Sequence, residues 1–367
     1  MAYAPHASHE GHLAKALVAL VAAVAAAFAI AASLPAHAHA ADREVVQVVD
    51  GVTTWIGDEA ALQKAIDDAG TKPVRIVLGC METPIDTTLK IPAGADIELV
   101  NNPHAIFGDA TSTLARADGF KGVMVRVEQG ASLTLAAHED GGRLQISSRG
   151  ESIPSSVPAV VVKGALVMND ADAADADQAR VKIFGARGMD GNYEGAVTVT
   201  GAQASFTMNG GAIYDNRRLQ DPSRAQYGAG NVAVADGATF TLNGGLIADG
   251  YGSAVNGDSY GDVGGVGVFK GAHFTMNGGT IVRNRGFAGG VEGFVWFQSP
   301  NSRDELEAVA ETNRAHIRIE GGMIADNEAG FGGGALLVLG NAEAVMNGGS
   351  MLRNSAPNGG AVNAMDL

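Results

Sequence analysis

Four aspartates are concentrated in one short stretch of the sequence, where they could act as ligands for a metal ion. They lie in an alanine-rich insertion at Asp170, Asp172, Asp175 and Asp177. Several carboxylates in one turn favour calcium, although this stretch lacks the glycine at the sixth position of an EF-hand loop. A solvated loop is the alternative interpretation. We therefore expect no cofactor in general, with calcium at these aspartates as the one ion that the sequence could accommodate.

Three aromatic residues, Phe294, Trp296 and Phe297, form a second group that could bind a ligand. They precede a long insertion, 298–314, in which residues 302–305 (SRDE) have the spacing of a capping box and predict a short helix. This helix could cover the rings as a packed lid. Alternatively, the rings form an exposed platform on which sugars or a partner protein would stack. If the protein binds a ligand, we expect it here first.

The remaining reactive side chains do not identify a reaction. The serine in Gly257-Asp-Ser-Tyr260 lies in a Gly/Asp loop without the strand-to-helix elbow of a lipase, and it therefore predicts a turn. The histidines His138, His273 and His316 have no partner at metal-ligand spacing, so zinc is not expected. The single cysteine, Cys80, ends an apolar run and is expected to be buried. Carboxylates from separate strands could still meet at glycosidase spacing, which leaves catalysis open.

A repeated octapeptide must position these groups. Its five copies are Phe206–Ile213 (FTMNGGAI), Phe240–Ile247 (FTLNGGLI), Phe274–Ile281 (FTMNGGTI), Ile317–Ile324 (IRIEGGMI) and Ala344–Met351 (AVMNGGSM). The first glycines of the pairs are 34, 34, 43 and 27 residues apart, so a fixed unit carries loops of variable length. Apolar and polar residues alternate, which indicates strands. We expect Phe206, Phe240 and Phe274 to stack inside the protein, and the glycine pairs to turn corners.

Asparagine recurs at two positions of the repeat. Within the octapeptide the positions are Asn209, Asn243, Asn277 and Asn347. Three residues after it they are Asn216, Asn284, Asn327 and Asn354, with Gly250 as the exception. We interpret these asparagines as structural, because asparagine accepts the left-handed conformation and can bond to its equivalent in the next coil.

The repeat predicts the fold. Weaker copies near Gly94, Gly130, Gly164 and Gly201 extend it toward the N-terminus, which gives about eight units of three short strands. Such units predict an all-β, parallel β-helix solenoid of about eight coils. The ends of a solenoid need caps, and residues 58–68 (DEAALQKAIDD) predict an N-terminal capping helix that begins at an aspartate. The C-terminal end is expected to be uncapped.

The first 40 residues predict export. An apolar run, 16–34, follows Lys15 and ends near Ala38 and Ala40, which fit an A-x-A cleavage site. An uncleaved membrane anchor is the alternative. The expected organisation is a signal peptide at 1–40, an N-terminal segment with the capping helix at 41–75, and the β-helix at 76–367. We expect an extracellular or cell-surface location and no membrane span after signal cleavage.

Composition limits the partners. The formal charge is −15, which disfavours nucleic acid and suits cations, basic proteins and neutral sugars. Glycine accounts for 51 of 367 residues, which argues against a helical bundle, while 46% hydrophobic residues argue against disorder.

Parts of the sequence resemble known families. The segments 57–66 (GDEAALQKAI), 74–78 (VRIVL) and 89–99 (LKIPAGADIEL) resemble the opening of secreted, pectate-lyase-like β-helix proteins of bacterial surfaces. The FTMNGGxI copies are similar to repeats in Gram-positive surface adhesins, and the segments Gly210–Ile213 and Gly333–Ala335 are loosely similar to repeats of autotransporter adhesins. The resemblance covers about 55–367 and implies a single-stranded, right-handed parallel β-helix. It does not imply an activity, since this fold includes both enzymes and adhesins.

These observations favour a secreted or cell-surface protein with a noncatalytic role. It would adhere to, or bind, a glycan or a host or cell-surface protein through loops on one flank. The alternative is a carbohydrate-active enzyme, either a polysaccharide lyase or a glycoside hydrolase. A third interpretation is a structural module of a longer surface protein.

Overall fold

The computed structural model describes residues 46–49, 52–55, 58–79, 82–103, 110–171, 175–219, 227–253, 261–295 and 312–365. The chain divides into two units, Met1–Arg43 and Glu44–Leu367, and all described residues belong to the second. Several predicted features lie outside the described residues: the signal peptide and its cleavage site, Cys80, Asp172, the serine loop at 257–260, Trp296, Phe297 and the insertion helix as far as residue 311.

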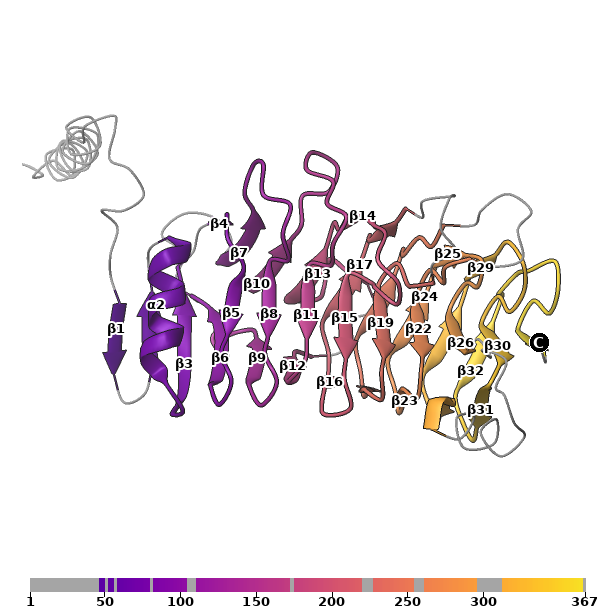
Figure 1. The fold of residues 1–367 in the computed structure, drawn as a ribbon. Coiled ribbons are helices and arrows are strands. Elements are labelled where there is room, and N and C mark those ends of the chain that lie inside the picture. The colour runs from indigo at the N-terminus through magenta and orange to yellow at the C-terminus, as the bar shows by residue number, and fades with distance from the viewer. Residues whose placement is uncertain are drawn as a thin grey trace, which may run out of the picture. The chain divides into compact units, whose positions relative to one another are not determined.

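Three parallel sheets build the second unit, and the chain visits them in turn (Figure 1). The first sheet has 11 strands: β1 (Val46–Val49), β2 (Val52–Trp55), β3 (Pro73–Leu78), β6 (Asp96–Asn101), β9 (Ser132–Ala136), β12 (Ala165–Asn169), β16 (Ser205–Met208), β20 (Thr239–Leu242), β23 (His273–Met276), β27 (Ala315–Ile319) and β31 (Ala342–Met346). The second sheet has nine: β4 (Glu82–Ile85), β7 (Thr111–Arg116), β10 (Arg143–Ser147), β13 (Val181–Phe184), β17 (Ala212–Tyr214), β21 (Leu246–Ala248), β24 (Thr280–Val282), β28 (Met323–Ala325) and β32 (Ser350–Leu352). The third sheet also has nine: β5 (Leu89–Ile91), β8 (Val125–Val127), β11 (Val160–Val162), β15 (Val197–Thr200), β19 (Val232–Ala235), β22 (Val266–Phe269), β26 (Val291–Val295), β30 (Leu336–Gly340) and β33 (Val362–Met365).

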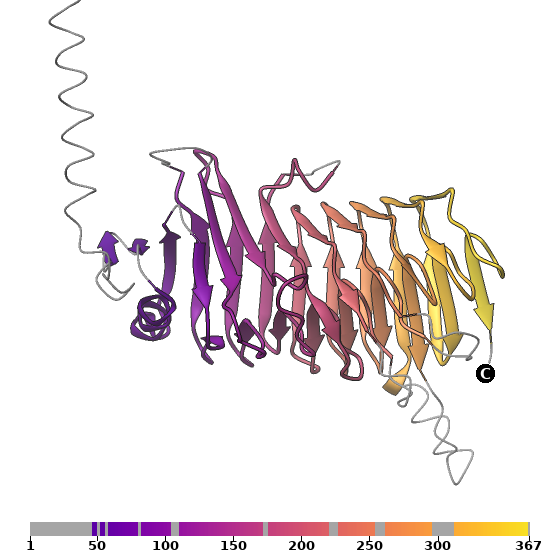
Figure 2. The same cartoon turned by 90° about the horizontal axis from the view of Figure 1, so that it is seen from above.

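Successive turns of the chain lie side by side in these sheets (Figure 2). Among the described strands, β1 and β2 form the one antiparallel pair. Two short parallel pairs, β14 (Arg187–Met189) with β18 (Arg217–Arg218) and β25 (Arg285–Gly286) with β29 (Glu328–Ala329), lie in the connections from the second sheet to the third. The predicted all-β parallel solenoid is therefore confirmed.

The interior is built from like residues stacked on like. Phe206 pairs in register with Phe240, and Phe240 pairs with Phe274. Their ring centroids are 4.7 and 5.1 Å apart, and all three side chains are buried. In-register pairing of parallel strands places equivalent residues about 4.8 Å apart, which is the spacing that stacked rings need.

The two glycines of the repeated pair are required for different structural reasons. A Cβ atom on Gly278 would lie 2.4 Å from the carbonyl oxygen of Asn243 in the preceding turn. Gly279 has a φ of +76°, a left-handed conformation that favours glycine. The first glycine therefore permits close approach of the backbones, and the second turns the corner.

The described asparagines of the repeat do not use the left-handed conformation that their residue type allows. The left-handed residue is the one before each asparagine of the second set, such as Asp215 (φ 52°), Arg283 (φ 57°) and Asp326 (φ 54°). Asn284 itself is buried, and its amide donates to the carbonyl of Ile247 at 3.1 Å. The preceding residue turns the corner, which leaves the asparagine free to point its side chain inward.

A helix covers the N-terminal end of the core, as predicted. It is α2 (Glu59–Ala69), and the Asp58 side chain accepts a hydrogen bond from the Ala61 N–H at 2.9 Å. Leu62 and Ile66 are fully buried against the first coil. In the part of the chain that the structure describes, no helix has the length and hydropathy of a membrane span.

Candidate functional site

Two of the predicted calcium aspartates, Asp170 and Asp175, have local structural roles. The Asp170 side chain is 2% exposed, pairs with Arg180 at 3.2 Å and accepts the main-chain N–H of Val181 at 3.0 Å. Asp175 accepts the N–H of Asp177 at 3.0 Å within a turn. Asp170 is therefore neutralised by an arginine at the base of the insertion. Among the described residues, no group of three His, Cys, Asp or Glu side chains could hold a metal ion.

Phe294 belongs to a buried layer and not to an exposed platform. Its side chain is 1% exposed, and its ring centroid lies 4.4 Å from that of Tyr227. It is covered because Phe294 faces outward from the third sheet into a second apolar cluster, which is separate from the solenoid core. The aromatic surface lies one layer further out.

That outer surface carries two stacked tyrosines, Tyr193 and Tyr227, which we call the tyrosine pair. Their ring centroids are 6.5 Å apart with an interplanar angle of 22°, and both residues are half-buried. Tyr193 also packs on Phe269, at 5.1 Å between centroids. Each tyrosine thus rests on a buried phenylalanine and keeps part of its surface accessible.

The backbone holds the tyrosine pair in place. Both residues lie in connections from the second sheet to the third, on adjacent turns. The Tyr193 N–H donates to the Tyr227 carbonyl oxygen at 2.5 Å, and the Tyr227 N–H donates to the Asn192 side-chain oxygen at 3.0 Å. Because these two loops are already ordered, binding of a ligand costs less conformational entropy of the protein.

A polar groove, which we call the corner groove, lies where the third sheet connects to the first. It has a volume of about 470 Å³ and is lined by Gln129, Lys163, Thr200, Gly201, Ala202, Gln203 and Asp236. The Gln129 side-chain amide donates to the Gln203 side-chain oxygen at 2.8 Å, although the residues are 74 positions apart. This volume is in the range of small-molecule sites.

Lys270 joins the corner groove to the tyrosine pair. Its Nζ atom lies 4.5 Å from the ring centroid of Tyr193 and 3.7 Å from a carboxylate oxygen of Asp236. Asp236 in turn accepts the Thr200 hydroxyl at 2.8 Å. Lys270 therefore contacts both a residue that lines the groove and one ring of the tyrosine pair.

A second hollow, of about 320 Å³, is less suited to binding. It is lined by several charged residues of the connections from the second sheet to the third. Arg187 is already paired with Glu151 and with Asp215, each at 2.8 Å. Arg149 pairs with Glu82. Because these charges are mutually neutralised, a ligand would have to displace existing ion pairs.

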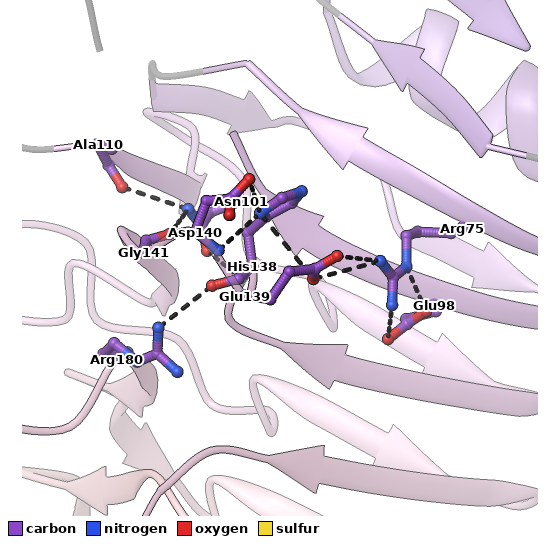
Figure 3. Close-up of polar contacts among 9 residues, drawn as sticks. All are labelled: Arg75, Glu98, Asn101, Ala110, His138, Glu139, Asp140, Gly141 and Arg180. Carbon is purple, nitrogen blue, oxygen red and sulfur yellow. Dashed lines mark hydrogen bonds and ion pairs between the residues drawn. The ribbon is translucent and has the colours of Figure 1, made fainter. Parts of the chain in front are cut away.

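A polar cluster near the N-terminal end is also internally paired (Figure 3). Arg75 lies between two carboxylates, at 2.7 Å from Glu98 and 3.2 Å from Glu139. The Nδ1 atom of His138 accepts the N–H of Asp140 at 3.1 Å.

Main-chain bonds explain why this cluster is present. The buried Asn101 side chain accepts the His138 N–H and donates to the Gly141 carbonyl, both at 2.8 Å. Arg180 donates to the His138 carbonyl at 3.2 Å. The cluster therefore joins neighbouring turns of the solenoid (Figure 3), and we assign it a structural role.

An ionisable cluster is buried beside the tyrosine pair. Arg218 and Asp262 are both fully buried and pair at 2.7 Å. Arg218 also donates to the Gly191 carbonyl at 2.6 Å. Burial raises the pKa of Asp262 to about 6, although Arg218 opposes this shift. Burial likewise raises the pKa of Glu194, which lies close to Arg218.

Sequence reasoning missed this surface for identifiable reasons. Tyr193 and Tyr227 are 34 residues apart, which is the repeat period, and that spacing was the available signal. Arg218 and Asp262 are 44 residues apart, a separation that matches no period. Comparisons with protein families, with curated proteins and with solved structures find no match for this chain.

Proposed function

We propose that the protein is an exported, cell-surface or extracellular, right-handed parallel β-helix of about eight coils that binds glycans without catalysis. The observation that carries this proposal is the tyrosine pair, which Lys270 links to a residue of a polar groove. The predicted signal peptide and the similarity to surface adhesins support the location.

The chemistry of the surface suits sugars. The apolar faces of pyranose rings stack on aromatic rings, and amide, hydroxyl and carboxylate groups bond to sugar hydroxyls. The groove offers two glutamine amides for this purpose, from Gln129 and Gln203. With a net charge of −15, the protein favours neutral glycans over anionic ones. No calcium is needed in this mechanism.

The test is retention on immobilised neutral polysaccharides, such as xylan, galactan and β-glucan, with polygalacturonate as the acidic comparison. We expect the double variant Tyr193→Ala/Tyr227→Ala to bind roughly 10–100-fold more weakly, since each aromatic contact contributes about 0.5–1.5 kcal/mol beyond area burial. Tyr214→Ala is the matched control, because Tyr214 stacks on Phe184 over the second sheet. Equal retention of all three proteins would reject the proposed surface.

A carbohydrate-active enzyme is the second candidate, and one observation favours it. Two carboxyl groups, Asp262 and Glu292, are buried near the tyrosine pair, with raised pKa values suited to acid catalysis. Both are at most 1% exposed, however, so a substrate could not reach them without rearrangement. Release of oligosaccharides from the same polysaccharides, abolished by Glu292→Gln, would favour the enzyme.

A further inference from the structure

Glu292 lies on an apolar surface where a charge is not expected. It is in β26 and faces outward from the third sheet, in register with Gly267 of β22 and Leu337 of β30. Its column also contains Ala233. The outward residues around it form the second apolar cluster, which includes Phe269 and Phe294.

Among the described residues, none supplies a counter-charge to the Glu292 carboxyl group. It is 1% exposed, and within the described structure its Oε2 atom has no hydrogen-bond partner. The two strands beside β26 read VGVF and LLVLG and supply no charge. The charged group that acts on it is Asp262, which is itself acidic.

The other described charges nearby face partners of their own, although the Nη2 atom of Arg218 and the Oδ2 atom of Asp262 have no hydrogen-bond partner. The Nε atom of Arg218 faces Asp262, and its Nη1 atom donates to a main-chain carbonyl. Glu194 accepts the Gly191 N–H at 3.1 Å. Lys270 lies at the outer edge, between Tyr193 and Asp236. None of these described contacts neutralises a negative charge at Glu292.

A buried carboxylate without a partner is strongly disfavoured, and such a group takes up a proton instead. Burial raises the pKa of Glu292 well above its ordinary value, and the neighbouring Asp262 raises it further. The neutral acid is therefore the form that fits the packed layer.

The same layer supports the tyrosine pair. Phe294 follows Glu292 by two residues on the same face of β26, and Tyr227 rests on it at 4.4 Å. Phe269, in the neighbouring strand β22, packs against Tyr193 in the same way. We propose that Glu292 is protonated in the closed protein, and that loss of this proton opens the aromatic layer that carries the tyrosine pair. The device regulates the proposed binding surface, but its test requires no glycan.

The direction of the pH dependence follows from linkage. An unfolded glutamate has a pKa of about 4.3, and the folded value is higher. The contribution of Glu292 to stability is therefore complete below about pH 4.3 and is lost as the pH rises through the folded pKa. Asp262, with a pKa of about 6, contributes with the same sign. Because a Glu292 variant retains Asp262, the difference between wild type and variant isolates Glu292.

The experiment compares amide hydrogen exchange of residues 227–235, 266–269 and 291–295 between pH 5 and 9 in the wild type and Glu292→Gln. Exchange rates are compared at equal pH, so the intrinsic pH effect cancels. We expect equal protection at pH 5 and at least tenfold faster opening of the wild type at pH 9. Glu328→Gln is the exposed control, because both partners of its ion pair with Arg285 are more than half exposed. The proposal would be overturned if the exchange rates of the wild type and of Glu292→Gln changed with pH in the same way.

A measurement on the unaltered protein covers the case in which the variant fails to fold. Infrared spectra of the wild type are recorded at pH 7.5 and at higher pH, and the difference between them is taken. The spectrum at pH 7.5 should contain the carbonyl band of one protonated carboxyl group, and this band should disappear as the layer opens at higher pH. Absence of the band at pH 7.5 would reject a protonated Glu292. If the pH response is present while the polysaccharide tests fail, the device stands and the binding proposal falls.

Discussion

At the scale of single residues, the buried asparagines form a ladder that continues across the one repeat lacking an asparagine. Gly250 occupies that position, and the Asn231 side chain fills its place. The Asn216 amide donates to Asn231, and the Asn231 amide donates to Asn284, both at 2.9 Å. A Cβ atom on residue 250 would lie 2.4 Å from the Asn231 amide nitrogen, so the glycine makes room for the substitute.

We predict that Asn231→Ala lowers the free energy of unfolding by roughly 2–3 kcal/mol. The change leaves the buried Asn216 side-chain amide without its acceptor, and an unsatisfied group of this kind costs about 1–3 kcal/mol. It also removes one of the donors to the Asn284 side-chain oxygen, which keeps the Gly250 N–H. Urea unfolding monitored by circular dichroism measures the difference. Asn243→Ala is the control, because Asn243 belongs to the exposed ladder and water can replace its bonds, so we expect at most about 1 kcal/mol. Equal losses in the two variants would contradict this reasoning.

Sequence reasoning reached part of this residue-scale arrangement. Period and residue type assigned the repeated asparagines to structure, because a ligand site would not follow the coil. They did not identify Asn231, which precedes a different strand and enters the ladder only through the three-dimensional path of the chain. For the same reason they did not identify Glu292, whose isolation depends on neighbours from other turns.

At the scale of elements, the short corners and the capping helix were predictable because their signals are local. The sequence predicts a helix at 58–68, and the structure has α2 at Glu59–Ala69 with Asp58 as its N-cap. Of the predicted aromatic group, the described part of the chain contains Phe294 alone, and this residue lies in a buried layer. Local composition singled out Phe294, but the fold buries it under Tyr227, which comes from an earlier turn. Which residues lie above which outside the core depends on contacts between different turns, so local sequence does not reveal it.

For the helix, we predict that Asp58→Ala lowers the free energy of unfolding by about 1 kcal/mol, because the Ala61 N–H loses its acceptor. Exchange of the amides at the start of α2 should accelerate more than exchange in β20. Asp58→Asn should stay within a few tenths of a kcal/mol of the wild type, since asparagine caps as well as aspartate. If Asp58→Asn is as damaging as Asp58→Ala, the charge and not the cap is important.

At the scale of the whole molecule, each turn contacts mainly its neighbours, so turns should be removable in whole units. Deleting residues 211–278 would join Gly210 to Gly279 and remove 68 residues, which is twice the repeat of 34. The remaining strands can then pair Ile183 with Ile281 and Val197 with Val291. The deletion also removes both members of the buried Arg218–Asp262 pair, so it leaves neither charge alone.

We predict that this shortened protein folds, unfolds cooperatively at a lower urea concentration, and loses glycan retention because Tyr227, Asp236 and Lys270 are gone. The asparagine ladder should close again, with Asn284 accepting the Ala186 N–H that Asn216 accepts in the full chain. Deleting residues 211–279 is the control: it puts Thr280 where a φ near +80° is required and shifts every later side chain toward the wrong face. Circular dichroism and size-exclusion chromatography distinguish the two proteins. If both deletions misfold alike, the turns are not interchangeable units and the additive view of this solenoid is wrong.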